Sequence, residues 1–509
     1  MSKLILDHWL KLVGFGANPF GTREAESEGA ELGQYFVEYP YFDEVLGSGL
    51  QPRTTFLFAD RGCGKSANRC MIEEYCRSQK IEGTVLAIPH TDFRTVLRAA
   101  GGDPARVTQD MHIHEILRRG VVALLDHLRR HPQSMQRLYE NDRPCWVTLL
   151  PPTYLTPTFV NHLLRQSSPG LGLTAAALQK AVRKRAWEAL LTTTRDEARP
   201  TVLLLALLLN AQAVSGAEPP LPVAQLQEFV QLLRFLGLDA VYILVDRVDE
   251  LPETAQTPQA GVALLRPLLN DLSLLQSSHL AFKFFLPTEM QPAVEAIART
   301  DRIVFRHVTW ASSDLQRLLE ARLKAFSDGR ISSLSQVSDV NLKDLDKQLV
   351  EQAAGSPRNL IRLGELAFSE HCRLPVDDRV QIDTEDWKRA RRQYWSELGL
   401  CMDPVTGRVI VAARELSLDA LTPHEYDALR FLYDHAGQLC TKDGLADSIY
   451  YDVETKDGVS DGAIDQTVSR LRKKIEPGEE PLFIITIPGK GYRLDHARPT
   501  SFSPGERKG

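Results

Sequence analysis

The stretch Thr54-Thr55-Phe56-Leu57-Phe58-Ala59-Asp60-Arg61-Gly62-Cys63-Gly64-Lys65-Ser66 decides the fold of the central part of this chain. Its first five residues are β-branched or apolar and predict a buried strand, whereas residues 67–78 continue as a helix. Between strand and helix, two glycines, a lysine and a serine stand at the spacing of a phosphate-binding loop, or P-loop. The first position of that pattern is Ala59 instead of glycine, which is a departure from it. The sequence predicts strand, loop and helix, with phosphate groups held at the loop.

The residue types of this loop define its predicted chemistry. Glycines allow backbone N–H groups to approach phosphate oxygens, a lysine reaches the β- and γ-phosphates, and a hydroxyl group binds Mg²⁺. We therefore predict an ATP site in which Lys65 also acts in catalysis and Ser66 is a ligand of Mg²⁺. The predicted ATP-binding residues of the loop are Arg61, Gly62, Cys63, Gly64, Lys65, Ser66 and Ala67.

A second apolar strand, residues 241–245, ends directly before Asp246. The second Mg²⁺ ligand of a P-loop site is expected at the carboxyl edge of a neighbouring strand. We predict that Asp246 and Ser66 hold Mg²⁺, that Glu250 polarises an attacking water, and that Asp249 belongs to the catalytic group. The alternative is a strand followed by a solvated acidic turn.

Further strand patterns lie at residues 84–88, 281–286 and 303–308. Buried strands that alternate with helices predict an α/β fold with a parallel sheet. The long sequence separation between Lys65 and Asp246 predicts a helical insertion at about residues 105–235. This insertion either binds a protein or ligand signal or is a structural elaboration that covers the sheet.

The chain divides into several predicted parts. Residues 1–45 form an N-terminal lead-in whose aromatic residues pack on the following domain, and residues 46–310 form the P-loop ATPase core. Residues 311–376 form a helical lid and residues 377–400 a charged connector. Residues 401–496 have the pattern of a compact α+β domain. The polar tail, residues 497–509, is predicted to be disordered.

The composition argues against a disordered, a collagenous or a disulfide-rich protein. The 509 residues are 43% apolar and 25% charged, as in an ordinary soluble globular protein. A net charge of −6 gives no overall attraction to nucleic acid, so DNA contact requires a local basic face. The strongest apolar run, residues 202–209, is too short to span a bilayer. We expect a cytoplasmic protein that has no membrane partner.

The C-terminal part contains three predicted helices and a hairpin. The first helix begins at Thr422, with Glu425 at capping-box spacing, and the second covers residues 441–451. The third covers residues 460–475 and has an apolar face and a polar face on opposite sides. Its apolar face contains Ile464, Val468, Leu471 and Ile475, and its polar face contains Gln466, Ser469, Arg470 and Lys473.

The polar face of the third helix suits the major groove of double-stranded DNA, where arginine meets guanine or phosphate and glutamine meets adenine. The hairpin, residues 483–494, places Lys490 at its tip for contact with a minor groove or a phosphate backbone. A solvated face or a protein-binding winged helix are the alternatives. The predicted DNA-binding residues are Gln466, Ser469, Arg470, Arg472, Lys473, Thr486, Lys490 and Arg493.

Residues 400–495 resemble the OmpR/PhoB-type winged-helix effector domain of two-component response regulators. The resemblance rests on Leu421-Thr422, Glu425 and Leu429, on the run 468–474, and on the wing 489–493. It implies a winged helix-turn-helix fold and DNA binding. Pro488 stands at a usually basic wing position, which weakens phosphate contact there, and no segment resembles the receiver domain of those phosphorelay proteins.

Residues 45–370 resemble the STAND and NACHT-like signal-transduction ATPases, relatives of the AAA+ class, because Asp246, Asp249 and Glu250 are arranged as Asp-x-x-Asp-Glu. The resemblance implies that Thr288 lies near the γ-phosphate. It also implies that Arg358, in Gly355-Ser356-Pro357-Arg358, contacts ATP from the lid; a helix-capping turn with a surface arginine is the alternative. Arg302 and Arg306 are considered as arginine fingers, and neither is assigned.

Together these patterns predict an ATP-dependent DNA-binding regulator of transcription. In this prediction, ATP binding and slow hydrolysis to ADP and phosphate control homo-oligomerisation and the presentation of the winged helix. One alternative is a replication-initiator-like or DNA-remodelling ATPase. Another is a STAND-type defence or stress sensor whose winged helix binds a protein.

Overall fold

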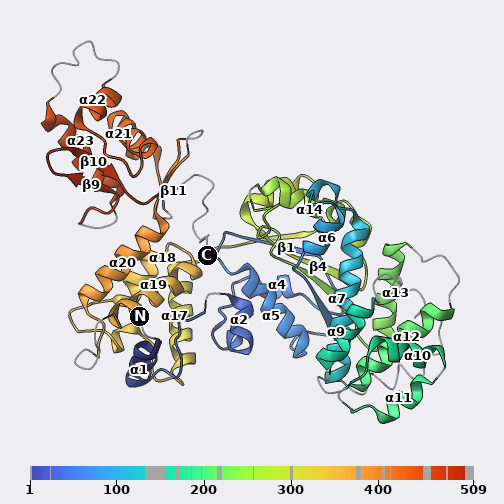
Figure 1. Cartoon of the computed structure of the whole chain (residues 1–509). Coiled ribbons are helices and arrows are strands. Elements are labelled where there is room, and N and C mark those ends of the chain that lie inside the picture. Colours follow the sequence, from blue (N-terminus) through green and yellow to red (C-terminus); the bar gives the residue numbers. More distant parts are fainter. Residues whose placement is uncertain are drawn as a thin grey trace. The chain divides into compact units, whose positions relative to one another are not determined.

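The computed structural model describes residues 3–22, 24–131, 134, 156–167, 172–184, 186–196, 198–214, 221–255, 257–298, 302–373, 380–403, 407–412, 414–450, 460–476 and 480–498. The chain forms two compact units (Figure 1). Residues 38–309 form the sheet unit. Residues 1–37 and 310–509 form the second unit, which contains a helical bundle and the C-terminal domain.

The sheet unit is built on parallel strands. Within the described residues, five strands pair in the order β2-β3-β4-β1-β5, and every pairing is parallel. β1, which leads into the predicted P-loop, therefore lies between β4 and β5. The predicted parallel α/β sheet is confirmed. The strands are β1 (Thr55–Ala59), β2 (Val85–His90), β3 (Ala240–Val245), β4 (Leu280–Pro287) and β5 (Val304–Val308).

The two faces of the sheet have different coverings. Phe56, Ile243 and Phe284 belong to one large apolar cluster together with the helices α7 (Gln109–Arg130) and α14 (Pro258–Leu269). Side chains alternate between the two faces along each strand, and the remaining strand residues face α5 (Lys65–Arg77), which begins at the P-loop. Such two-sided burial explains why the strands appear in the sequence as nearly continuous apolar runs.

A buried lysine lies on the α5 face of the sheet. Lys283, in the middle of β4, donates a hydrogen bond to the Arg53 carbonyl at 2.8 Å, and its ammonium lies 4.5 Å from the centre of the Tyr242 ring. Burial lowers the pKa of Lys283 to about 7. Its hydrogen bond and ring contact compensate part of the cost of burying an amine in the sheet.

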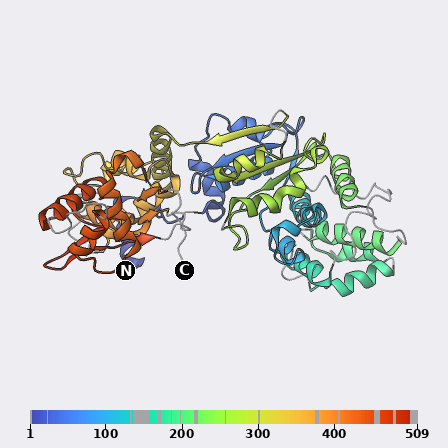
Figure 2. The ribbon, with the colours of Figure 1, turned by 90° about the horizontal axis from the view of Figure 1, so that it is seen from above.

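Helices occupy the chain between β2 and β3. They cluster beside the sheet in both views (cyan to green in Figures 1 and 2), and their apolar residues join the same cluster that covers the sheet. Besides α7 they are α9 (Pro157–Ser167), α10 (Ala175–Arg183), α11 (Trp187–Thr193), α12 (Arg199–Val214) and α13 (Pro222–Phe235). The shorter elements of the sheet unit are α4 (Phe42–Leu46), α6 (Arg94–Ala99), η2 (Pro104–Arg106), α15 (Leu272–Leu275), η4 (Thr288–Met290) and α16 (Gln291–Glu295).

The N-terminal segment corrects one prediction. Residues 1–37 belong to the same compact unit as the helical bundle, whereas the prediction assigned them to the sheet unit. Phe368 is the reason: its ring lies 4.9 Å from that of Trp9 and 5.0 Å from that of Phe20. Residues 38–45 do pack on the sheet unit, where Phe42 meets Tyr75 of α5. The N-terminal elements are α1 (Lys3–Val13), α2 (Ala25–Glu28), η1 (Gly29–Glu31) and α3 (Leu32–Tyr35).

The predicted connector, residues 377–400, is largely an integral helix of the bundle. Its helix α20 (Thr384–Leu398) buries Trp387 and Tyr394, and its Asp386 bonds His371 at 2.8 Å inside the bundle. Residues 377–379 lie outside the described residues. The other bundle elements are α17 (Ser312–Phe326), η5 (Leu334–Gln336), α18 (Leu345–Ala353) and α19 (Pro357–His371).

The C-terminal domain has the predicted winged-helix elements. Thr422 and Glu425 form the expected capping box at the first helix. Gly491, with φ of +137°, lies so close to the next layer that a Cβ there would meet the Cys440 carbonyl at 2.1 Å. The elements are β6 (Leu400–Met402), β7 (Val409–Val411), β8 (Arg414–Leu416), η6 (Leu418–Ala420), α21 (Pro423–Asp434), α22 (Lys442–Ile449), α23 (Asp461–Ile475), β9 (Ile484–Ile487), β10 (Gly491–Leu494) and β11 (Ala497–Arg498).

The strand β11 corrects the predicted start of the disordered tail. Ala497 and Arg498 pair with β6, and residues 499–509 lie outside the described residues. In the described part of the chain, every helix is too short or too polar to cross a lipid bilayer.

The Phe368 contacts predict that the N-terminal segment stabilises the bundle. Phe368→Ala removes a fully buried ring and should lower the free energy of unfolding of the bundle by about 3–5 kcal/mol. Chemical denaturation of the full chain measures this loss. Val340→Ala is the matched control, because Val340 is 83% exposed; equal stability of the two variants would contradict the packing described.

A buried histidine pair joins the sheet to the insertion. His112 of α7 bonds the Leu264 carbonyl at 2.8 Å through Nε2, and its Nδ1 lies 2.9 Å from Nε2 of His90. Because the carbonyl can only accept, Nε2 of neutral His112 carries the proton and its Nδ1 accepts from His90. Burial lowers the pKa of His112 to about 4 and that of His90 well below its usual value.

These shifts predict acid sensitivity. The histidines are neutral when folded and take up protons near pH 6.5 when unfolded, so stability should fall as the pH drops from about 6.5 towards 4. His112→Gln keeps a donor and an acceptor but does not titrate. It should reduce this slope by up to about 1.4 kcal/mol per pH unit in denaturation series. Identical slopes would refute the assignment.

Candidate functional site

The backbone of the predicted P-loop has the required shape. Gly62 and Gly64 have φ of +82° and +92°, a region that side chains disfavour. Gly64 is the N-cap of α5, and no side chain caps that helix end. The first N–H groups of α5 therefore have no capping oxygen from the N-cap side chain, which is the arrangement that binds a phosphate group.

The Lys65 side chain folds back on the loop. Its Nζ lies 3.1 Å from the Ala59 carbonyl and 3.4 Å from the Asp60 carbonyl. Both partners are neutral, so the ammonium charge is not compensated by either of them. Two glycines of positive φ, a helix N-terminus and an amine are the parts from which phosphate-binding loops are built. Ser66 and Ala67 form the first turn of α5 beside it.

The acidic segment after β3 meets the loop through one residue pair. Arg61 of the loop lies 3.4 Å from the Asp249 carboxylate. Glu250 instead pairs with Arg247, whose φ of +65° is a strained value for a non-glycine residue. The structure thus brings Asp249 to the loop, whereas the Glu250 carboxylate is committed to an ion pair.

Asp246, one of the two predicted Mg²⁺ ligands, is held by partners within the chain. Asp246 is 1% exposed, and its Oδ2 lies 3.2 Å from Nε of Arg69. Its Oδ1 accepts the Arg247 N–H at 2.8 Å. β3 is also separated from β1 by β4, so Asp246 does not follow a strand adjacent to the P-loop strand as predicted. Both carboxylate oxygens of Asp246 thus face partners from the chain itself, Arg69 and the Arg247 N–H.

Thr288 lies at the loop end of the sheet and has a partner that the sequence analysis missed. Its hydroxyl shares a 2.9 Å hydrogen bond with Nε2 of His307. Thr288 follows β4 and His307 lies in β5, so the bond joins the two strands that flank β1. A histidine inside the apolar run 303–308 was the signal available in the sequence.

The predicted arginines differ in their surroundings. Arg306 binds both carboxylate oxygens of Glu44 at 2.6 Å, within the sheet unit. Arg302 lies just before β5. Arg358 is exposed in the first turn of α19, which belongs to the other compact unit.

The basic helix of the C-terminal domain presents the predicted polar face. Gln466, Ser469, Arg470 and Lys473 are exposed on α23, whereas Ile464, Val468, Leu471 and Ile475 are buried. Lys490 is exposed at the turn between β9 and β10.

Three other predicted DNA-binding residues make contacts inside the domain. Arg472 donates to the Ile484 carbonyl at 2.6 Å and to the Thr486 hydroxyl at 2.8 Å. Arg493 pairs with Asp495 at 2.7 Å. Arg472 thus fastens the recognition helix to the wing, since its guanidinium also lies over the Tyr492 ring. Its role in this structure is to hold the domain together.

Comparison with known proteins identifies this domain. Residues 419–494 match the family described as "Transcriptional regulatory protein, C terminal". PhoB of Escherichia coli, the phosphate regulon transcriptional regulatory protein, is 30% identical over 96 residues, which cover 19% of this chain and 39% of PhoB. PhoP of Bacillus subtilis, the alkaline phosphatase synthesis regulator, is 35% identical over 80 residues, covering 15% of this chain and 32% of PhoP. The C-terminal domain is an OmpR/PhoB-type DNA-binding domain, and the match spans about two fifths or less of these relatives.

Two solved structures add to the comparison. The DNA-binding domain of Klebsiella pneumoniae RstA, in complex with the RstA box, is 31% identical and covers 19% of this chain and 89% of its own, with a TM-score of 0.16. The Aeropyrum pernix Orc1 protein in complex with DNA covers 92% of this chain and 88% of its own at 13% identity and a TM-score of 0.32. At these TM-scores neither structural likeness carries an argument.

The contacts of Arg472 predict a structural loss that its neighbour does not share. Arg472→Met leaves the Ile484 carbonyl and the Thr486 hydroxyl without this donor and should cost about 1–3 kcal/mol of stability. Arg470→Met changes an exposed side chain and should stay within about 0.5 kcal/mol of the wild type. Thermal and chemical denaturation compare the two; equal losses would show that Arg472 does not hold the wing.

Proposed function

We propose that this chain is an ATP-dependent regulator of transcription. In this proposal the C-terminal domain binds double-stranded DNA, the P-loop binds ATP, and the nucleotide state controls how the DNA-binding domain is presented. The observation that carries the proposal is the exposed basic face of α23 within an OmpR/PhoB-type domain.

Four exposed residues of α23 have a proposed role in DNA binding. Arg470 and Lys473 are to bind phosphates or guanine, and Gln466 and Ser469 are to bind base edges in the major groove. Lys490 is to contact the DNA backbone next to this groove. Because Arg472 already binds the wing, its contribution to DNA binding is indirect.

The ATP half of the proposal rests on the loop geometry. Gly62 and Gly64 in left-handed conformation, the N-terminus of α5 and the Lys65 amine support the binding of a triphosphate. Thr288 is to lie near its γ-phosphate, as the resemblance to STAND and AAA+ proteins implies. Asp249 and Glu250 are to support hydrolysis; since both are held in ion pairs with arginines, we expect slow turnover.

The proposed switch is oligomerisation. ATP-bound chains are to associate and present two winged helices together, since binding to two spaced half-sites gains affinity through linkage. A slow ATPase suits this use, because its turnover limits the lifetime of the assembled state. The helical insertion at about residues 105–235 is the part proposed to bind a protein or ligand signal.

The experiment measures DNA affinity and oligomeric state of the full chain without nucleotide, with ADP and with a non-hydrolysable ATP analogue. Duplexes selected from a random pool serve as the target. We expect the analogue to raise DNA affinity by about tenfold or more. Lys65→Ala should abolish this increase and keep the basal DNA affinity. Arg470→Met/Lys473→Met should lower DNA affinity in every state.

Two results would decide against the proposal. Identical DNA affinity and oligomeric state in all three nucleotide conditions would contradict the proposed switch. Full DNA affinity of the Arg470→Met/Lys473→Met variant would show that α23 is not the DNA-binding element.

A further inference from the structure

Arg69 and Asp246 form a buried ion pair at the carboxyl edge of the sheet. Arg69 lies one turn beyond Lys65 on α5, and its side chain is only 5% exposed. Asp246 is the acid that the P-loop pattern assigns to Mg²⁺, yet its Oδ2 faces the guanidinium at 3.2 Å. A guanidinium is protonated at every physiological pH, so this positive charge is permanent.

The carboxylate cannot serve both cations in this arrangement. A Mg²⁺ ion requires oxygen ligands at about 2.0–2.1 Å in octahedral geometry. Asp246 Oδ2 is directed at Arg69, and Oδ1 accepts the Arg247 N–H. A divalent ion beside Asp246 would also be repelled by the neighbouring guanidinium in a site with little water.

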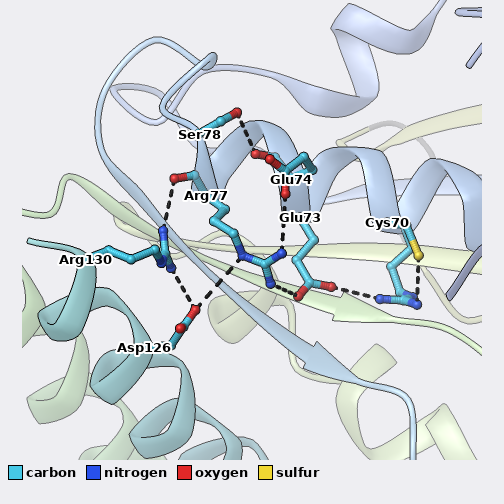
Figure 3. Close-up of polar contacts among 8 residues, drawn as sticks. Cys70, Glu73, Glu74, Arg77, Ser78, Asp126 and Arg130 are labelled. Carbon is cyan, nitrogen blue, oxygen red and sulfur yellow. Dashed lines mark hydrogen bonds and ion pairs between the residues drawn. The ribbon is translucent and has the colours of Figure 1, made fainter. Parts of the chain in front are cut away.

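Arg69 has a second carboxylate partner that leads away from the site. Its Nη1 lies 3.0 Å from Glu73 Oε2, and Glu73 Oε1 lies 3.0 Å from Nη2 of Arg77. Figure 3 shows Glu73 and Arg77 continuing to Asp126 and Arg130 of α7. These four residues line a cavity of about 260 Å³ between α5, β2 and α7.

Arg69 binds two carboxylates at once, those of Asp246 and Glu73. With Asp246 and Glu73 both bound, the guanidinium neutralises the acid at the edge of the sheet. If Arg69 were removed by mutation, Asp246 would lose this counter-ion, and a divalent cation could take its place. Breaking a buried pair is costly because it leaves the remaining charge uncompensated, so the wild-type pair is expected to persist.

We propose that Arg69 takes the place of a divalent cation at Asp246, so that this chain binds ATP without depending on Mg²⁺ at that residue. Arg69 is then a specificity-determining residue for the metal requirement of the site. This inference rests on the proposed ATP site.

The first test measures the affinity of a fluorescent ATP analogue in EDTA and in millimolar Mg²⁺. We expect the wild-type affinity to change by less than about threefold and that of Arg69→Met to rise by about tenfold or more in Mg²⁺. Arg77→Met is the matched control: it makes the same change on the same helix and touches Glu73, but not Asp246. It should behave as the wild type does.

Two outcomes of this test would overturn the inference. One is a wild-type affinity that already requires Mg²⁺ and loses this requirement in Asp246→Asn. The other is an Arg69→Met affinity that is as insensitive to Mg²⁺ as that of Arg77→Met.

The second test needs no nucleotide and so separates this inference from the proposed function. Unfolding is compared in EDTA for Asp246→Asn, Arg69→Met and the double variant. If Arg69 is the counter-ion, Asp246→Asn should raise the unfolding equilibrium constant by about tenfold or more, and adding Arg69→Met should recover much of the loss. Should Asp246→Asn leave stability unchanged or increase it, Asp246 has no counter-ion and the inference fails. If no variant binds nucleotide but this coupling is present, the ATP proposal fails and the Arg69–Asp246 pairing stands.

Discussion

A parallel sheet has to be covered on both faces, and this constraint organises the sheet unit. β1 pairs with β4 on one side and β5 on the other, so the chain leaving β1 has to cross over the sheet as a helix. α5 does so, and its path carries Arg69 from the P-loop to the end of β3, where it meets Asp246. The site is thus assembled by the covering of the sheet as much as by the loop itself.

The buried polar groups of this unit follow from the same constraint. The helices that exclude water from the sheet also enclose Asp246, Lys283 and the His90–His112 pair. Each of these groups has a hydrogen-bond partner within the fold: a guanidinium for Asp246, a backbone carbonyl for Lys283, and another imidazole for His90. An unpaired group at any of these places would cost several times what the bond itself contributes.

The sequence predicted most of the local structure, because hydrophobic period and capping residues are local signals. The strand before the P-loop, the capping box at Thr422 and the two faces of α23 were all readable in this way. The pairing of Arg69 with Asp246 was not, since it depends on the strand order and on the direction of α5. The place of the N-terminal segment was missed for the same reason: aromatic residues predict burial, but Phe368 determines where.

The chain passes from one unit to the other at residues 37–38 and again at residues 309–310. β5 precedes the second crossing in sequence and contacts the segment that follows the first crossing. Thr309 follows β5 directly, and Arg306 of β5 holds Glu44, a few residues beyond the first crossing. The next residue, His307, bonds Thr288 at the loop end of the sheet. β5 therefore contacts the proposed nucleotide site through one side chain and the entering segment through its neighbour. A change at Thr288 that displaced β5 would act on both crossings at once, which gives the proposed switch a covalent route towards the DNA-binding domain.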